Sequence, residues 1–391
     1  MNIPIATYRI QFSPSFGFQS ASSVVPYLSD LGISDLYASP IFKATKGSLS
    51  GYDVVDPNHL NPELGGLSDL ELLSAELQKH DMGWIQDIVP NHMAMDSGNG
   101  ILMDILVNGY NSQYFNFFDV DWGNPPAGPN KRLLAPFLGK FYGDCLEDGE
   151  IALTYGPDGF KVAYYNLAFP LRIESYSYLF KDLSPLKRKL AEDDPDFIKV
   201  LGIFYVLKTL SSSDDPKKRS NQIKLIHRTM LELYNSNAAI RTLVDENIGE
   251  FNGEKGKPES FNALDDLLSQ QLFRLSFWKV AAEEINYRRF FCINDLISLR
   301  MEDDSVFNHM HGLIFDLIKR RIVTGLRIDH IDGLYDPTTY LQELRKRGRL
   351  CLICRKNPGP FRGQRVSERT GSLHQESRSF WYAQLPLTGA Y

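Results

Sequence analysis

The stretch Thr324-Gly-Leu-Arg-Ile-Asp-His-Ile-Asp-Gly-Leu334 decides the fold that we expect for this chain. Its apolar first half is typical of a short buried strand, and Pro337 suits the first turn of a helix that follows. Arg327 and Asp329 lie two residues apart, so their side chains point to one face of that strand. An arginine beside a carboxylate keeps the carboxylate ionised, although most such pairs are plain salt bridges. In a parallel α/β barrel, this strand end is where catalytic side chains lie.

Two other polar segments also occupy expected strand ends or the loops after them. Asp87-Ile-Val-Pro-Asn-His92 closes an apolar run, and its asparagine and histidine could donate hydrogen bonds to sugar hydroxyls. Gly51-Tyr-Asp-Val-Val-Asp-Pro57 places Tyr52 where it could stack on a sugar ring. Taken singly, each segment is more often a loop anchor or a half-buried tyrosine. Their order along the chain is therefore more informative than any one of them.

The order of expected elements indicates a parallel α/β architecture with a long interruption. Strands are expected at 5–12, 35–39, 84–89 and 322–328, and helices at 21–31, 67–80 and 337–347. Ser68 is the expected N-cap of the second helix, with Glu71 completing a capping box. Residues 93–185 are aromatic and loop-rich, whereas 190–300 have amphipathic helical spacing, above all at 197–210, 220–234 and 264–287. We therefore expect one α/β domain formed by 1–92 and 301–345, interrupted by an insertion in 93–300.

Composition excludes whole classes of protein. The 391 residues are 43% hydrophobic and 12% aromatic with a net charge of −6, which excludes a disordered, collagen-like or disulfide-scaffold chain. No apolar run reaches the ~18 residues of a membrane helix, and residues 1–11 lack signal-peptide features. Four cysteines in a chain of this length favour a cytoplasmic protein. No phosphate-binding glycine loop is found in the sequence, and the pair in Cys351-Leu-Ile-Cys354 supplies only two of the four ligands of a structural zinc, so we expect no cofactor and no metal.

The three polar motifs, in this order after strands two, three and four, resemble the α-amylase superfamily of (β/α)8-barrel enzymes, glycoside hydrolase family 13. Finer motifs resemble the maltooligosyltrehalose synthase family, the (1→4)-α-D-glucan 1-α-D-glucosylmutases, over residues 4–345. These motifs are at 6–12, 36–40, 51–57, 62–66, 87–93, 118–122, 287–291 and 325–337. The resemblance implies the N-terminal portion of a TIM barrel, strands 1–4, with a large and mostly helical insertion after strand 3. Cys292 departs from the pattern, which has an acidic residue there.

The resemblance also implies residue roles and a reaction. Asp329 would be the nucleophile and Arg327 its charge partner, while Asp87 would be a structural member of its motif. The residues expected to bind substrate are Tyr52, Asp53, Asn91, His92 and His330. The implied reaction is a retaining intramolecular transfer that converts the reducing-end α-1,4 bond of a maltooligosaccharide into an α,α-1,1 bond. A maltooligosyltrehalose trehalohydrolase would then act in the same pathway.

The last 46 residues differ from the rest of the chain. Residues 346–391 contain nine Lys/Arg and two Glu, a charge of +7, whereas the preceding 345 residues carry −13. The resemblance implies a general-acid glutamate on strand five, and none stands there. Four further β/α units of ~30 residues do not fit either, so an incomplete barrel is expected.

A codon reading offers an explanation for the tail. Cys354-Arg-Lys-Asn-Pro-Gly-Pro360 can be encoded as TGT CGA AAA AAT CCT GGG CCC. Reading one base later gives Val-Glu-Lys-Ile-Leu-Gly, the strand-five motif that the resemblance implies. We therefore expect an out-of-frame tail and impaired activity, because general acid catalysis contributes ~10²–10⁴-fold.

Alternatives stay open. An α-amylase-type hydrolase would share the motifs but admit water to its acceptor site, and a non-catalytic fragment would at most bind α-glucan weakly. Nucleic-acid binding by the basic tail is disfavoured because no recognisable binding fold accompanies the charge. The insertion aromatics could line a closed acceptor pocket or form a small core of their own. They are Tyr110, Tyr114, Phe115, Phe117, Phe118 and Trp122.

Overall fold

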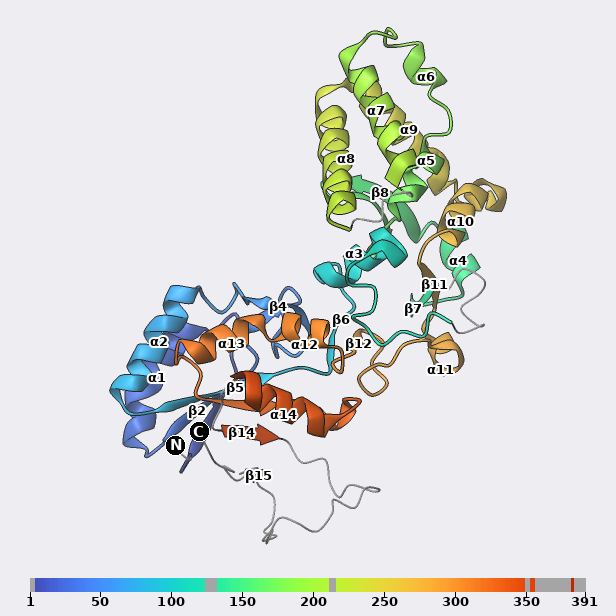
Figure 1. The fold of residues 1–391 in the computed structure, drawn as a ribbon. Coiled ribbons are helices and arrows are strands. Elements are labelled where there is room, and N and C mark those ends of the chain that lie inside the picture. The colour runs from blue at the N-terminus through green and yellow to red at the C-terminus, as the bar shows by residue number, and fades with distance from the viewer. Residues whose placement is uncertain (1–3, 124–131, 211–215, 349–351, 356–380, 383–391) are drawn as a thin grey trace. The chain divides into compact units, whose positions relative to one another are not determined.

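The computed structural model describes residues 4–123, 132–210, 216–348, 352–355 and 381–382 (Figure 1). The chain forms two compact units. One unit is made of residues up to Ala94 and from Ser298 onward, and the other of Met95–Ile297. The first unit is therefore discontinuous in sequence, with the whole second unit inserted between two of its strands.

A largely parallel sheet forms the centre of the first unit. Its order is β1-β2-β5-β13-β14-β15; the first five strands are parallel and β15 is antiparallel to β14. The strands are β1 (Thr7–Ile10), β2 (Asp35–Ala38), β5 (Gly83–Ile88), β13 (Gly325–Ile328), β14 (Leu352–Arg355) and β15 (Trp381–Tyr382). Parallel neighbours need crossover connections, and helices supply them. These are α1 (Phe18–Asp30), α2 (Leu67–Lys79), α12 (Asp304–Met310), α13 (Gly312–Lys319) and α14 (Pro337–Gly348). This order agrees with the parallel α/β architecture predicted from the sequence.

The apolar faces of the helices explain why they pack as they do. The buried positions of α1 are Phe18, Ala21, Val25 and Leu28, and those of α2 include Leu70, Leu73 and Leu77, both at helical spacing. The N-cap predicted for α2 was wrong by two residues. Gly66 precedes the helix, and its backbone N–H donates to the Asp69 carboxylate at 2.8 Å. An aspartate at the third helical position therefore takes the role that we assigned to Glu71.

An antiparallel pair, β3 (Phe42–Ala44) and β4 (Val54–Leu60), carries the loop with Tyr52 and Asp53. The short strand β6 (His92–Ala94) follows β5 after the three residues Val89, Pro90 and Asn91. Each of these segments leads away from a strand of the central sheet. The polar motifs found in the sequence therefore lie in connections that follow β2, β5 and β13.

The second unit mixes helices and strands. Its strands are β7 (Leu133–Leu138), β8 (Ile151–Gly156), β9 (Gly159–Tyr164), β10 (Leu167–Pro170) and β11 (Phe273–Phe277); β12 (Leu296–Ser298) leads back to the first unit. Its helices are α3 (Gly100–Asn108), α4 (Tyr142–Glu147), α5 (Tyr176–Leu179), α6 (Ser184–Lys187), α7 (Pro195–Leu210), α8 (Pro216–Ser236), α9 (Ala238–Asn252), α10 (Asn262–Ser269) and α11 (Ala281–Glu284). β8, β9 and β10 form an antiparallel sheet, and β7 pairs with β11 in parallel.

Two expectations for this unit were wrong and two were confirmed. α7 and α8 cover the helices predicted at 197–210 and 220–234. The helix predicted at 264–287 ends at Ser269, because Phe273, Leu275 and Phe277 alternate with period two and pair with β7. Residues 93–185 are also more than loops, since four strands lie among them.

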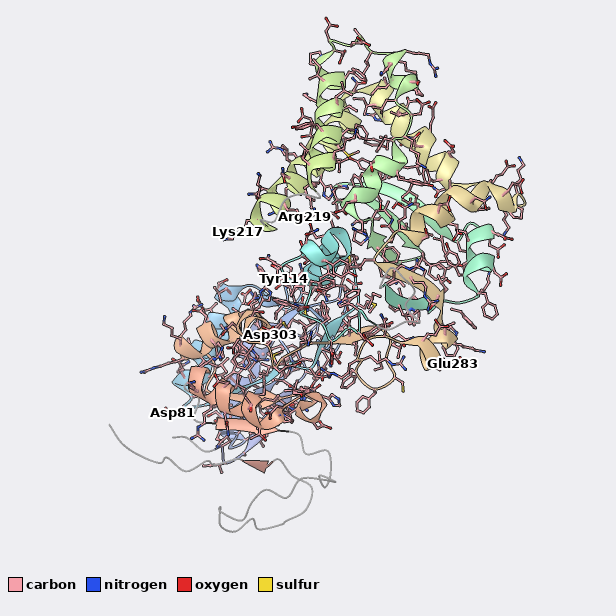
Figure 2. All side chains as sticks on the ribbon, turned by 45° about the vertical axis from the view of Figure 1, so that its right-hand side comes forward. Asp81, Tyr114, Lys217, Arg219, Glu283 and Asp303 are labelled. Carbon is pink, nitrogen blue, oxygen red and sulfur yellow. The ribbon has the colours of Figure 1, made fainter. Side chains whose placement is uncertain are left out.

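A buried arginine joins three elements of the second unit. Arg219 of α8 is almost fully buried, and Figure 2 labels it among the packed side chains. Its guanidinium donates to Asn108 at 3.1 Å, to the Leu210 carbonyl at 2.9 Å and to Glu174 at 2.5 Å. These bonds compensate for burial of the charge. Among the described residues, no helix combines the length and apolar character needed to cross a bilayer.

Candidate active site

Arg327 joins two aspartates at the carboxyl ends of neighbouring strands. Its Nη1 donates to Asp87 Oδ1 at 2.7 Å, to Asp87 Oδ2 at 2.9 Å and to Asp329 Oδ1 at 2.8 Å. The geometry follows from strand register, since Arg327 lies directly opposite Asp87 in the parallel pair β13–β5. Asp329 comes just after β13, where its backbone N–H donates to the Ile88 carbonyl at 2.9 Å. The structure thus brings together three residues that the sequence placed at two separate strand ends.

Asp87 is the centre of the hydrogen-bond network. Its side chain is fully buried, and its Oδ2 accepts from the hydroxyls of Tyr52 at 2.7 Å and Tyr37 at 2.9 Å. Arg9 lies beside both tyrosines, 3.3 Å from the Tyr52 hydroxyl and 5.5 Å from the Tyr37 ring centre. Tyr37 and Arg9 were not predicted as site residues. Both residues belong to motifs of the resemblance, at 36–40 and 6–12, but no function was assigned to either of them from the sequence.

Burial sets the protonation states in this network. Burial raises the pKa of the Asp87 carboxyl, while Arg327 and the Tyr52 hydroxyl oppose the shift. For the Arg327 guanidinium, burial acts downward, but the charge and hydrogen bonds of Asp87, together with Tyr37 and Asp329, raise the pKa above its ordinary value. Burial and the Asp87 charge also raise the pKa of Tyr52 to about 12. The tyrosine hydroxyls therefore stay neutral donors near pH 7.

Asp329 is the member of this network that a ligand can reach. Its side chain is 14% exposed, compared with 0% for Asp87. A carboxylate held on one oxygen by a guanidinium and open at its surface can attack an electrophilic carbon. Asp87 cannot take that part, because its oxygens are buried and hydrogen-bonded. The two aspartates therefore have different chemical possibilities although they share one arginine.

Two adjacent side chains, Asn91 and His92, lie buried after β5. Asn91 Nδ2 is 3.3 Å from His92 Nδ1. Burial lowers the pKa of His92 to about 4, with Asp329 opposing the shift, so the imidazole is neutral at pH 7. A neutral imidazole can both donate and accept a hydrogen bond. This pair therefore offers an amide and a neutral ring beside the Arg327 network.

His330 follows Asp329 in a left-handed backbone conformation, with φ of 47°. The turn brings Gly333 close to Asn91, where an added Cβ would lie 2.7 Å from Asn91 Oδ1 and closer still to the His330 ring. Glycine is thus required by this approach. Tight packing between the turn after β13 and the segment after β5 fixes where Asn91 and His330 lie.

Asp53 has local partners instead. Its carboxylate accepts hydrogen bonds from the hydroxyls of Thr45 and Ser48, and its carbonyl accepts from the Thr45 N–H at 3.1 Å. These contacts fix the β3–β4 loop and with it the neighbouring Tyr52. The substrate-binding role predicted for Asp53 stays a prediction, whereas its loop-anchoring contacts are present.

The strand that follows in the sheet is β14, whose last residue, Arg355, pairs with Ile328 of β13. An arginine thus ends the strand on which the resemblance implies a glutamate. The rest of the tail, at 349–351, 356–380 and 383–391, lies outside the described residues, and so does the predicted change of frame. The described residues contain no group of three or more His, Cys, Asp or Glu that could hold a metal ion.

The insertion aromatics pack on one another. Ring centres of Tyr110 and Phe115 are 4.7 Å apart, those of Phe115 and Trp122 4.8 Å, and those of Tyr114 and Phe117 5.0 Å. Phe117 and Phe118 are buried. These contacts favour the explanation that the rings form a small core of the second unit. Cys292, the departure from the motif pattern, is exposed.

Comparisons with known proteins give a consistent result. The catalytic domain of α-amylase matches residues 18–131. A putative maltooligosyl trehalose synthase of Mycobacterium tuberculosis is 31% identical over 349 residues, which is 88% of this chain and 33% of that protein. The chain thus spans about one third of the length of the curated maltooligosyl trehalose synthases that it matches.

Solved structures of the same kind are similar in fold. Maltooligosyltrehalose synthase from Arthrobacter ramosus is 27% identical with a TM-score of 0.63, over 92% of this chain and 36% of that one. A hypothetical maltooligosyl trehalose synthase from Sulfolobus tokodaii is 28% identical with a TM-score of 0.60, over 90% and 35%. Together with the central parallel sheet, these likenesses support a fold of the TIM-barrel type.

Proposed function

Because the chain is related to the maltooligosyl trehalose synthases of the α-amylase family, we propose that it carries the nucleophile half of a glucan mutase site. The reaction is that of a (1→4)-α-D-glucan 1-α-D-glucosylmutase. A maltooligosaccharide loses its reducing-end α-1,4 bond and gains an α,α-1,1 bond at the same glucose. The observation that carries this proposal is the bridge from Arg327 to Asp87 and Asp329.

The first step assigns a role to each side chain. An Asp329 oxygen bonds to the anomeric carbon, and the bond from this carbon to the glycosidic oxygen of the terminal glucose breaks. The glycosidic oxygen, which leaves with the glucose, takes a proton from a general acid. Arg327 keeps Asp329 ionised, and Asp87 fixes the guanidinium by accepting from it at 2.7 and 2.9 Å. We assign Tyr52 and His92 to the sugar in subsite −1, with Asn91 and His330 beside it. Asp53 holds the loop that presents Tyr52.

In the second step the released glucose attacks the same carbon through its own anomeric hydroxyl. The bond from the anomeric carbon to Asp329 breaks, the attacking hydroxyl gives its proton back to the group that acted as general acid, and two inversions leave the α configuration. Water must stay out during this step, because its attack would give hydrolysis instead. A trehalohydrolase acting on maltooligosyltrehalose is the partner activity that would consume the product.

The general acid is the part that we assign to none of the described residues. A retaining pair of carboxyls lies ~5–5.5 Å apart, and Asp87 is excluded by its burial. We propose that the sheet holds strands 1–4 of a (β/α)8 barrel with an insertion after strand 3, and that the acid belongs to strand five. A chain without that acid is therefore expected to be impaired in turnover.

Product analysis tests the proposal and its alternatives. Purified chain is incubated with maltopentaose, and reducing ends and non-reducing product are measured, with Asp329→Asn as control. Slow loss of reducing ends that Asp329→Asn abolishes supports the mutase. A rise in reducing ends supports an α-amylase-type hydrolase, and binding without turnover supports a non-catalytic α-glucan binder. Robust mutase turnover would contradict the expected impairment.

A further inference from the structure

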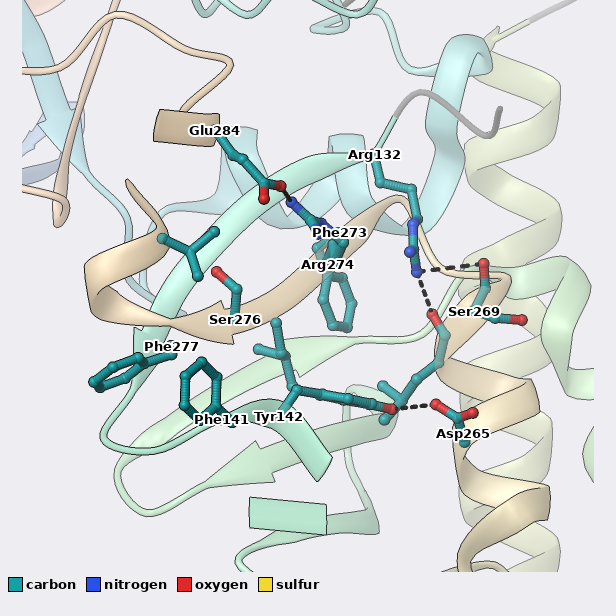
Figure 3. A pocket seen from close by; sticks show the side chains of 13 residues that line it. Arg132, Phe141, Tyr142, Asp265, Ser269, Phe273, Arg274, Ser276, Phe277 and Glu284 are labelled. Carbon is teal, nitrogen blue, oxygen red and sulfur yellow. Dashed lines mark hydrogen bonds and ion pairs between the residues drawn. The ribbon is translucent and has the colours of Figure 1, made fainter. Parts of the chain in front are cut away.

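A pocket of about 280 Å³ lies within the second unit (Figure 3). It is formed by β11, the start of α4, the α10 helix and Arg132 just before β7. Its volume is just below the range of pockets that enclose drug-sized ligands, ~300–1,000 Å³, so it suits one ring-sized ligand. None of its lining residues has a role in the site around Arg327.

Polar groups of both kinds converge on this pocket. Arg132 Nη1 donates only to the backbone carbonyls of Leu268 at 3.3 Å and Ser269 at 3.5 Å, as Figure 3 shows. Within the described part of the chain, no carboxylate forms an ion pair with this arginine. Tyr142 donates its hydroxyl to Asp265 Oδ1 at 2.7 Å. The pocket therefore offers unused guanidinium donors beside a carboxylate that can still accept.

Charge in the pocket is balanced. Arg274 pairs with Glu284, and Arg132 and Asp265 contribute one charge of each sign. A charged ligand of either sign would be repelled by the group of like charge. A neutral ligand with hydroxyls would instead form hydrogen bonds with both Arg132 and Asp265. Burial, together with nearby Arg274, lowers the pKa of the Arg132 guanidinium, which nevertheless stays charged at neutral pH.

A buried hydroxyl is left over in the wall. Ser276 of β11 is 5% exposed, and its Oγ has no hydrogen-bond partner among the described residues. An unpaired buried hydroxyl costs free energy, and most buried polar groups in native proteins have a hydrogen-bond partner. Ser276 also lines the pocket, so a hydroxyl-bearing ligand is a candidate partner for its Oγ.

Aromatic rings form the outer wall. Phe141 is 67% exposed, and its ring centre lies 5.3 Å from that of Phe277. Trp278 does not line the pocket, but it is exposed and its ring centre lies 5.8 Å from that of Phe277. The faces of such rings are electron-rich and attract the C–H groups of a flat ligand face. Exposed aromatic faces next to hydrogen-bonding groups suit a ligand with one apolar face and a rim of hydroxyls.

We infer that this pocket binds one pyranose ring of a neutral saccharide, with the ring face on the exposed Phe141 and vicinal hydroxyls on Arg132 and Asp265. The choice of an α-glucan as that saccharide rests on the proposed function. The pocket would hold part of a glucan chain on the second unit, independently of the carboxylate that we assign to the chemistry.

A site-specific reporter tests the inference in the full chain. The four tryptophans are labelled with 5-fluorotryptophan, and the ¹⁹F resonance of Trp278 is assigned with Trp278→Phe. Titration with maltotriose is expected to shift this resonance with saturation. Arg132→Gln removes the charged fork and is expected to weaken binding at least tenfold. Arg241→Gln, a change of the same kind on α9, is the matched control and is expected to leave binding unchanged.

Two further variants distinguish a wrong inference from a misfolded protein and from a wrong assignment of the mutase reaction. Phe141→Ala changes an exposed side chain, so it keeps the fold and is also expected to weaken binding at least tenfold. Asp329→Asn is expected to leave the Trp278 titration intact whatever its effect on turnover. Absence of any shift up to ~10 mM of either maltotriose or cellotriose, or a shift that Arg132→Gln and Phe141→Ala leave unchanged, overturns the inference. A shift with cellotriose but not maltotriose keeps a saccharide site and rejects an α-glucan.

Discussion

Arg327 lies directly opposite Asp87 in the sheet, and one nitrogen of its guanidinium contacts both oxygens of that carboxylate, at 2.7 and 2.9 Å. The same nitrogen reaches Asp329 at 2.8 Å. The buried partner therefore fixes the arginine, and the arginine in turn fixes the accessible carboxylate. Stability and chemistry depend on the same three side chains, and this link yields the first test.

Asp87→Asn leaves Arg327 buried with only Asp329 as its carboxylate partner. We expect a loss of ~3–5 kcal/mol in the free energy of unfolding, which is typical when one member of a buried pair is removed. Urea unfolding at pH 7 measures it. Asp329→Asn is the comparison, and it should cost clearly less because Asp87 still pairs with the arginine. Equal losses for the two variants would show that Asp87 is no more important than Asp329 for holding Arg327.

Tyr52→Phe removes a hydroxyl that donates to Asp87 at 2.7 Å. The carboxylate keeps its bonds to Arg327 and Tyr37, so we expect a loss of ~1–3 kcal/mol. Any turnover should fall further than stability alone explains, because Tyr52 is also assigned to the sugar. Tyr110→Phe, at an exposed tyrosine of the second unit, is the control. Unchanged stability in Tyr52→Phe would show that its hydroxyl is not an effective donor.

His92 gives a dependence on pH. Its pKa of about 4 in the folded chain lies below the ordinary 6.5, so the unfolded chain binds this proton more tightly. The contribution of neutral His92 to the free energy of unfolding is fully present above pH 6.5. As the pH falls from about 6.5 to 4, the free energy of unfolding decreases by ~3 kcal/mol. His227 and His311 also have lowered pKa values, so the difference between the parent chain and His92→Gln isolates this term. Parallel stability curves for the two proteins across this range would exclude it.

Gly333→Ala tests the close approach after β13. An added methyl group meets Asn91 Oδ1 at 2.7 Å, so we expect a cost of ~1–3 kcal/mol and displacement of Asn91 or His330. Gly249→Ala, on helix α9 with open space around it, should be neutral or stabilising. Thermal unfolding of both variants makes the comparison. A Gly333→Ala protein as stable as the parent would show that the turn accommodates a methyl group without strain.

Strand ends explain how much of the site could be predicted from sequence. Asp87, Arg327 and Asp329 lie on short apolar runs in a parallel sheet, and register alone brings them together. The likeness to maltooligosyl trehalose synthases, first indicated by motifs, is confirmed by the comparisons. Tyr37 was missed because its part depends on which strand lies beside β5, and local sequence carries no such signal.

The errors in the second unit have a different cause. Strand β11 was taken for helix because Leu264, Leu267 and Leu268 continue into Phe273 and Leu275 without a glycine or proline between them. Period two over five residues is too short to outweigh the helical spacing before it. Its partner, β7, is more than 130 residues earlier in the chain. Pairing at that distance cannot be read from a local pattern.

The insertion of one unit inside the other also has a consequence during synthesis. Asp87 and Arg327 are 240 positions apart, so at ~5–20 residues per second the aspartate leaves the ribosome about 12 to 48 s before its partner. During that interval β5 lacks its β13 neighbour, and its carboxylate lacks its counter-ion. Folding of Met95–Ile297 in the meantime would bring the two ends of that segment to a fixed separation and shorten the search for β13. The second unit can thus act as a folding aid for the site, quite apart from any ligand that it binds.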